Sequence, residues 1–172
     1  MSLLALHLND AGVLLTDGEK ILCREPGFAL LEDDGVVTGR EAWAVASLKP
    51  RRIQNRYWAE LSTAPLSDRR FQHLSAADLA SKQLESIWRR AAKPGDKLVL
   101  AVPPYMSTES LGLLLGVAQD LEIPVAGMVD AAVAATRREY VNAVPVHIDL
   151  ALRSAMLTRL SQAGQAQSDH FW

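Results

Sequence analysis

The sequence predicts an α/β domain in which a mixed β-sheet is flanked by helices. Short apolar runs separated by turn residues fill residues 3–38, which is typical of a meander of antiparallel strands. From residue 75 onward, apolar runs alternate with segments of helical periodicity, the β-α-β-α-β pattern of parallel strands joined by helices. A meander followed by such units predicts a sheet that contains both antiparallel and parallel pairs.

The composition is that of an ordinary globular domain. The chain has 172 residues, of which 49% are hydrophobic and 22% charged, enough for one domain with a sizeable core. Its net charge of −2 gives no bulk attraction to nucleic acid or to a membrane, and we expect neither partner. The single cysteine, Cys23, and the absence of Cys/His spacing predict no internal disulfide and no metal site. With no signal-peptide pattern, a cytoplasmic location is expected.

The meander is expected to contain four strands followed by a short "VVTG" segment. Turn residues separate its members: "NDAG" after the first, Asp17 and Gly18 after the second, and "DDG" after the fourth. The fourth run is either a separate strand or an extension of the third past Pro26. The strands are expected at residues 3–8, 12–18, 20–25 and 27–33.

The segment after the meander predicts a helix and then a basic stretch. Ala42, Ala44, Val45 and Leu48 have helical spacing and precede Pro50, which ends the helix. Arginines broken by Tyr57 and Trp58 follow. They predict a solvated face with two aromatic anchors, or else a patch that binds anions or nucleic acid. We favour the solvated face, and the candidate patch residues are Arg51, Arg52 and Arg56, with Trp58 beside them.

The second half predicts alternating helices and strands. Ser75 and Asp78 resemble a capping box at the start of one helix, and Ser107 can cap the next. The apolar stripe of the first helix is Leu79, Leu84, Ile87, Trp88 and Ala91; the inward residues of the second are Leu111, Leu114, Leu115, Ala118 and Leu121. Strands are expected at residues 97–103, 123–129 and 144–150.

Asp130 stands between a strand and a helix rich in alanine. It is well placed as an N-cap, and the alanines allow the helix to pack closely against a neighbour. A ligand site at this junction is the alternative, because ligands of α/β folds bind beyond the carboxyl ends of strands. On spacing alone we favour packing, by residues Ala131, Ala132, Ala134 and Ala135.

The order of these elements resembles the first lobe of the actin-like ATPase superfamily, which includes actin, sugar kinases and the DnaK-type chaperones. The resemblance covers roughly residues 3–160 and is most specific at residues 97–135, where "VDAAVAA" stands at the place of the chaperones' "NEPTAAAL". "GREAW" (39–43) is similar to their "GEAA" segment. The resemblance implies a ribonuclease-H-like lobe over residues 1–142. Residues 143–172 would then be an incomplete second lobe, consisting of a hairpin and a tail.

The resemblance also implies where a nucleotide would bind. In these ATPases the first hairpin reads Asp-x-Gly followed by Thr or Ser, and here those places hold His7, Asn9 and Asp10. The second phosphate loop keeps Asp149 but has Ala151, Leu152 and Arg153 in place of glycines. The positional candidates are His7, Asn9, Asp10, Asp149, Arg153 and Ser154, and none is expected to be catalytic. Each also has an ordinary structural role in a turn or at a strand end.

These departures predict a degenerate, non-hydrolysing protein that acts through protein contacts. Members of the family need two lobes around the nucleotide, so we expect either a fragment or a one-lobed relative. No cofactor is expected, and ATP with Mg²⁺ would bind only if a second lobe exists. The alternatives are an ATP-binding chaperone-like protein whose second lobe lies outside this chain, and a binder that uses the basic patch. The apolar hairpin predicts self-association, or a protein partner, through residues 144–162.

Overall fold

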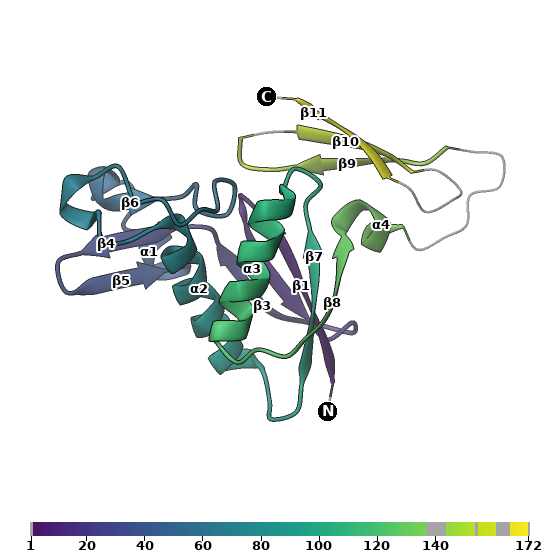
Figure 1. Ribbon diagram of the computed structural model, residues 1–172, viewed down its shortest axis with the longest axis horizontal. Coiled ribbons are helices and arrows are strands. Elements are labelled where there is room, and N and C mark those ends of the chain that lie inside the picture. Colours follow the sequence, from purple (N-terminus) through teal and green to yellow (C-terminus); the bar gives the residue numbers. More distant parts are fainter. Residues whose placement is uncertain (1, 137–143, 154, 161–165, 172) are drawn as a thin grey trace.

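The computed structural model describes residues 2–136, 144–153, 155–160 and 166–171, the last of these as backbone only. Its central feature is a five-stranded sheet of order β3-β2-β1-β7-β8 (Figure 1). Strand β1 pairs antiparallel with β2 and parallel with β7, so the sheet is mixed, as predicted. The strands are β1 (Leu3–Asn9), β2 (Gly12–Thr16), β3 (Ile21–Pro26), β7 (Lys97–Val102) and β8 (Val125–Asp130).

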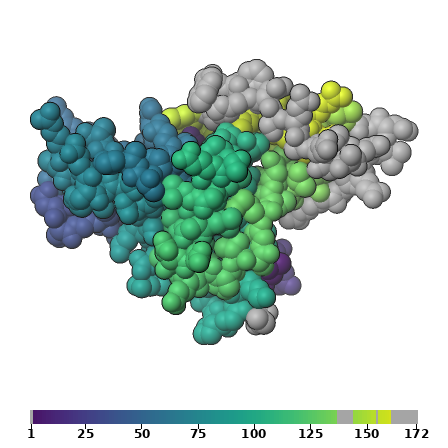
Figure 2. Space-filling model, viewed as in Figure 1, coloured from purple at the N-terminus to yellow at the C-terminus, as the bar shows by residue number. Residues whose placement is uncertain are grey.

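One face of this sheet carries the core. In β1 the buried residues Leu4, Leu6 and Leu8 alternate with half-buried ones, because side chains of a strand point to opposite faces in turn. Helices α2 (Ala76–Ala91) and α3 (Thr108–Asp120) cover the buried face. Figure 2 shows α3 and the residues after it across the front of the molecule. The core therefore lies between the sheet and these two helices.

Helix α2 begins where the sequence predicts. The Asp78 carboxylate accepts a hydrogen bond from the Ser75 backbone N–H at 2.7 Å, and the Asp78 N–H donates to Ser75 Oγ at 3.2 Å. This reciprocal arrangement is a capping box, which satisfies two N–H groups that the first turn leaves free. The predicted stripe is buried at Leu79, Leu84 and Ile87.

The meander divides between two sheets instead of continuing in one. Strands β4 (Ala29–Glu32) and β5 (Gly35–Thr38) join β6 (Ile53–Gln54) in a sheet of order β5-β4-β6. The chain leaves β3 at Pro26, where the Gly27 N–H donates to Ala11 O and the Phe28 N–H donates to Pro26 O. The run at residues 27–33 is therefore a separate strand and not an extension of β3.

Two helical predictions are wrong in detail. Helix α1 (Arg40–Ala44) ends four residues before Leu48, whose side chain is 79% exposed instead of facing inward. After α1 the chain bends, with the N–H groups of Leu48 and Lys49 both donating to Val45 O, and it enters the short 3₁₀ helix η1 (Pro50–Arg52). A second 3₁₀ helix is η2 (Arg69–Phe71).

In α3, Leu115 is 42% exposed, although the predicted inward residues Leu114 and Ala118 are buried.

Helix α4 (Ala131–Ala135) is short, and the part of the prediction that extended past residue 136 lies outside the described residues. Ala131 and Ala132 are buried, whereas Ala134 and Ala135 are exposed. The close-packing prediction is thus confirmed for the first two alanines and wrong for the other two. In the described chain, no helix is both long and apolar enough to cross a membrane.

A third sheet, of order β11-β10-β9, lies beyond the carboxyl ends of β1 and β7 (Figure 1). The predicted hairpin is present as β9 (Val146–Leu150) and β10 (Ala155–Leu160), which pair antiparallel. The sequence analysis did not predict β11 (Ala166–Phe171), which pairs with the other side of β10. The proposed division at residues 142 and 143 falls in a segment outside the described residues.

Candidate functional site

The turn after β1 and the turn after β9 meet at one place. Asp10, in the first turn, is only 3% exposed. Its Oδ1 accepts a hydrogen bond of 2.6 Å from the backbone N–H of Leu152 in the second turn, and its Oδ2 lies 4.0 Å from Nη1 of Arg153. A buried carboxylate therefore joins two turns that the sequence analysis had selected separately as phosphate loops.

Arg153 is held in place from a third direction. Its Nη1 donates to the carbonyl oxygen of Asn55 at 3.0 Å, and its Nη2 donates to Asn55 Oδ1 at 2.5 Å. Asn55 directly follows β6, so the guanidinium links the third sheet to the second while it faces Asp10 of the first. The sequence analysis missed Asn55, because nothing local marks a residue whose partner is 98 positions away.

Asn9 uses its side chain within its own turn. Its Oδ1 accepts hydrogen bonds of 3.0 Å from the N–H groups of both Ala11 and Gly12. Glycine is required at position 12 because a Cβ there would lie 2.5 Å from the carbonyl oxygen of Glu25. Asn9 thus shapes the turn that presents Asp10, and its amide oxygen is already engaged by these two bonds.

His7 and Asp149 lie close enough at this junction to influence each other electrostatically. Burial lowers the pKa of His7; the Asp149 carboxylate opposes this shift and His147 adds to it. Asp149 Oδ2 is buried and has no hydrogen-bond partner among the described residues. Ser154, the remaining positional candidate, lies outside the described residues.

Tyr105 also belongs to this junction and was missed. Burial raises the pKa of Tyr105, and the carboxylates of Asp10 and Asp149 raise it further. Tyr105 follows the buried strand β7 in "VPPY", and residues just past the carboxyl ends of strands are where α/β folds place ligands. That position is the signal by which the sequence could have identified it.

The junction is poorly suited to a phosphate group. The carboxylate of Asp10 already accepts from the Leu152 N–H and faces Arg153, so an incoming phosphate oxygen would meet a negative charge there. Within the described residues, no group of three or more His, Cys, Asp or Glu side chains is arranged to hold a metal ion. The arrangement can hold the two turns together. The charge of its cation, Arg153, is neutralised by Asp10 of the same chain.

The basic patch is less available than its sequence suggests. Arg52 Nη1 lies 2.7 Å from a carboxylate oxygen of Glu32, and Arg56 pairs with Glu60 at 3.2 Å, while Arg51 is exposed. Trp58 is 3% exposed and therefore offers no face on which a base could stack. The patch formed by Arg51, Arg52 and Arg56 therefore stays a prediction, and Trp58 gives it no aromatic surface on which a base could stack.

The junction at Asp130 has the geometry of a helix cap. Asp130 Oδ1 accepts hydrogen bonds from the N–H groups of Ala132 at 2.7 Å and Val133 at 3.3 Å. These are two of the donors that the first turn of α4 leaves free, so the N-cap prediction is confirmed.

The mixed sheet with helices on one face, and two hairpin turns that meet beyond its strand ends, define the fold of a lobe of an actin-like ATPase. The chain is similar to solved structures of MreB5 of Spiroplasma citri, bound to AMPPNP (TM-score 0.70, 17% identity) and to ADP (TM-score 0.72, 18% identity). The alignments cover 97% and 98% of this chain and 51% of each MreB5 chain, so this chain spans about half their length. At this identity the likeness shows the fold alone, and it confirms the predicted fold class. Searches against protein families and against curated proteins find no match.

Proposed function

We propose that this chain is a degenerate, DnaK-type member of the actin-like ATPase fold, which does not hydrolyse ATP and acts through protein contacts. The cytoplasmic location expected from the sequence is part of the same proposal. The observation that carries it is the buried Asp10 carboxylate, which accepts the Leu152 N–H and faces Arg153. The groups best able to receive a phosphate at this junction are already engaged by a carboxylate of the chain itself.

Nucleotide titration tests this proposal directly. A ligand that binds only the folded state raises the melting temperature by an amount that grows with the logarithm of its concentration divided by its Kd. We expect ATP with Mg²⁺, and ADP with Mg²⁺, to leave the melting temperature of the chain unchanged, and we expect no phosphate release above the buffer rate. A rise in melting temperature that continues with nucleotide concentration would show that nucleotide binds and would contradict the proposal. Turnover that is lost in Asp149→Asn would contradict the non-hydrolysing function.

An ATP-binding protein that needs a second lobe is the alternative. The observation in its favour is that four of the six positional candidates, His7, Asp10, Asp149 and Arg153, lie at one junction in the structure. On this alternative, Asp10 is displaced when the nucleotide and the other lobe bind together. A rise in melting temperature that requires both ATP and a separately supplied second lobe would favour it over the degenerate protein.

We also propose that the chain associates with itself through residues 144–162. Val146, Ile148 and Leu150 on β9 and Leu157 on β10 are between 38% and 73% exposed, and they share one face of the hairpin. Among the described strands, β9 is at the edge of its sheet, and in this proposal its outer backbone groups pair with a second β9 related by a two-fold axis. Pairing of two copies would cover the exposed side chains and the free edge together.

Light scattering on matched variants distinguishes dimerisation through this interface from non-specific association. Ile148→Glu places a charge in the centre of the apolar face, whereas Leu48→Glu places one at a side chain that is 79% exposed elsewhere. We expect the wild-type chain and Leu48→Glu to form dimers and Ile148→Glu to be monomeric. A monomeric wild-type chain at high micromolar concentration, or equal dimerisation of all three proteins, would show that this interface does not form.

A further inference from the structure

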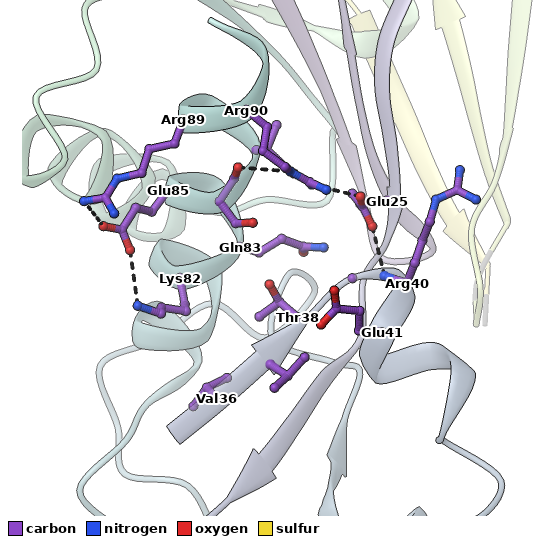
Figure 3. Close-up of a pocket in the computed structure, with 14 residues that line it drawn as sticks. Glu25, Val36, Thr38, Arg40, Glu41, Lys82, Gln83, Glu85, Arg89 and Arg90 are labelled. Atoms are coloured by element: carbon purple, nitrogen blue, oxygen red, sulfur yellow. Dashed lines mark hydrogen bonds and ion pairs between the residues drawn. The ribbon is translucent and has the colours of Figure 1, made fainter. Parts of the chain in front are cut away.

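A groove runs between helix α2 and the outer edge of strand β5 (Figure 3). Lys82, Glu85 and Arg89 of α2 line one side, and Val36 and Thr38 of β5 line the other. The cavity has a volume of about 580 Å³, and it is separate from the junction at Asp10. A helix beside a strand edge is a geometry into which an extended peptide can add as a further strand.

The floor of the groove is a fixed carboxylate. Glu25 is 6% exposed, and its carboxylate accepts hydrogen bonds of 2.9 Å from the Arg40 backbone N–H and from Arg90 Nη2. Gly39 passes so close that a Cβ there would lie 2.4 Å from Glu25 Oε2, and its φ of +76° is one that side chains disfavour. These contacts hold the end of β5 and the start of α1 against β3.

A second buried side chain, Gln83, fixes α2 to the same floor. Its Oε1 accepts hydrogen bonds from the Tyr57 hydroxyl at 2.6 Å and from Trp58 Nε1 at 2.7 Å, and its Nε2 donates to Pro26 O at 2.9 Å. Gln83 is 1% exposed, so all of these bonds are shielded from solvent. Gln83 therefore fixes α2 against the end of β3 and against Tyr57 and Trp58.

Strand β5 borders this groove, and in the part of the chain that the structure describes its outer edge is paired with no other strand. The sheet order β5-β4-β6 places β5 at the edge. Val37 lies opposite Leu30, and the Gly39 N–H donates to Phe28 O, so the bonded pairs with β4 fall at the odd-numbered residues of β5. The N–H and C=O groups of Val36 and Thr38 consequently point away from β4. A strand of four residues offers an edge of about 13 Å, enough for a short extended segment.

The most exposed charges on the side of α2 that lines the groove are positive. The side chains of Lys82, Arg89 and Arg90 are 58%, 76% and 56% exposed. Their carboxylate partners are withdrawn, with Glu85 at 24% and Glu25 at 8%. Glu85 is shared between Lys82 and Arg89, which leaves one positive charge unbalanced on this wall. At the α1 end of the groove, Arg40 and Glu41 offset each other.

We propose that this groove binds an extended acidic peptide segment of a partner protein. The segment pairs with the outer edge of β5 through the backbone groups of Val36 and Thr38, and its carboxylates lie against Lys82, Arg89 and Arg90. Main-chain bonds supply affinity and the cations select for acidic side chains. The inference does not depend on whether nucleotide binds at the Asp10 junction.

The experiment uses the full chain and a fluorescein-labelled peptide of alternating glutamate and valine, with binding followed by fluorescence anisotropy. Arg89→Glu reverses an exposed charge of the groove, and Arg51→Glu does the same at an exposed arginine outside it. We expect Arg89→Glu to weaken binding roughly tenfold and Arg51→Glu to leave it within about twofold. A peptide in which lysine replaces glutamate should not bind measurably.

Val36→Pro tests the strand addition itself. It removes a backbone N–H that points away from β4, and proline is tolerated on an edge strand, so the melting temperature should be retained while peptide binding is lost. If Val36→Pro does not fold, the unaltered chain with a peptide N-methylated at alternate residues replaces it, and binding should again be lost. Equal binding of the lysine peptide, or binding that survives both backbone changes, would overturn the proposal. Binding lost only in Ile148→Glu would place the peptide on β9 instead, which would also overturn it.

Discussion

Two buried carboxylates, Asp10 and Glu25, have nearly the same surroundings and different roles. Each is almost fully buried, each accepts one backbone N–H, and each faces one arginine. Arg90 donates directly to Glu25 at 2.9 Å, whereas Arg153 stays 4.0 Å from Asp10 and donates to Asn55 instead. Glu25 thus completes a closed set of bonds within the body of the lobe. Asp10 is a link between separate sheets, beside a cation that has another partner.

Both carboxylates are buried, so burial does not explain their different roles. The placement of the arginine does: Arg90 bonds directly to Glu25, whereas Arg153 bonds to Asn55 beside Asp10. Without Glu25, the floor of the groove would lose its acceptor for both Arg40 and Arg90. Without Asp10, Arg153 would still be held by Asn55, and the Leu152 N–H would become free. We therefore expect changes near Glu25 to affect stability most and changes near Asp10 to affect the contact between sheets.

The largest effect is expected for Gly39→Ala. The backbone at φ +76° and ψ −138° is strained for any side chain, and the added Cβ would collide with Glu25 Oε2. We expect a loss of about 3 kcal/mol in the free energy of unfolding, measured by urea denaturation. The same change combined with Glu25→Ala should cost less than the sum of the two single changes, because the collision is removed while the strain remains. Simple additivity would contradict this account of Gly39.

Glu25→Ala alone should cost about 2 kcal/mol, because it leaves the Arg40 N–H unsatisfied in a partly buried position. Glu25→Gln retains an acceptor for that N–H and should cost less. The order of the two variants in urea midpoint is the measurement. If Glu25→Gln proved as damaging as Glu25→Ala, the charge of Glu25 would matter and its acceptor oxygen would not.

Asp10→Ala should cost about 1 kcal/mol, less than Glu25→Ala, because the Leu152 N–H loses its partner while Arg153 keeps its bonds to Asn55. Asp10→Asn keeps an oxygen for this bond and serves as the matched control. Amide hydrogen exchange at Leu152 should quicken in Asp10→Ala and remain slow in Asp10→Asn. Unchanged exchange in both variants would show that the two turns do not depend on this contact.

The smallest effect is expected for the pH dependence caused by His7. Its pKa in the folded chain lies below the ordinary value of 6.5 because of burial, so the folded state binds its proton less readily than the unfolded state. The free energy of unfolding should therefore fall as the pH is lowered through 6.5 toward the folded pKa. His7→Gln should reduce the difference in urea midpoint between about pH 7.5 and about pH 5.5.

Local sequence patterns predicted most of the helices and strands correctly. The errors fall where an element depends on a partner that is distant in the sequence. The capping pairs at Ser75 and Asp130 lie within three residues of their donors, and both were predicted correctly. The division of the meander at Pro26 depends on β4 pairing with β6, which comes later in the chain. Leu48 has helical spacing, but its helix ends at Ala44, so periodicity alone placed it on the wrong face.

The candidate site was predictable in part for the same reason. The resemblance selected both turns, and the structure brings them together at Asp10 and Leu152. It assigned Asp10 to a phosphate-facing position without indicating that the second turn supplies its donor. Asn55 entered the junction only through a tertiary contact that no spacing in the sequence describes, whereas the position of Tyr105 just past β7 was a signal that the sequence analysis did not use.

The position of β1 in the centre of its sheet has a consequence for how the chain is made. Strands β1, β2 and β3 can pair as soon as they emerge from the ribosome, but the other edge of β1 waits for β7. The bond from the Ser2 N–H to Asp96 spans 94 residues, which corresponds to roughly 5–20 s of synthesis at ordinary rates. During that interval an apolar strand edge lies open on the nascent chain, and this is the period in which we expect the protein to be most prone to aggregation.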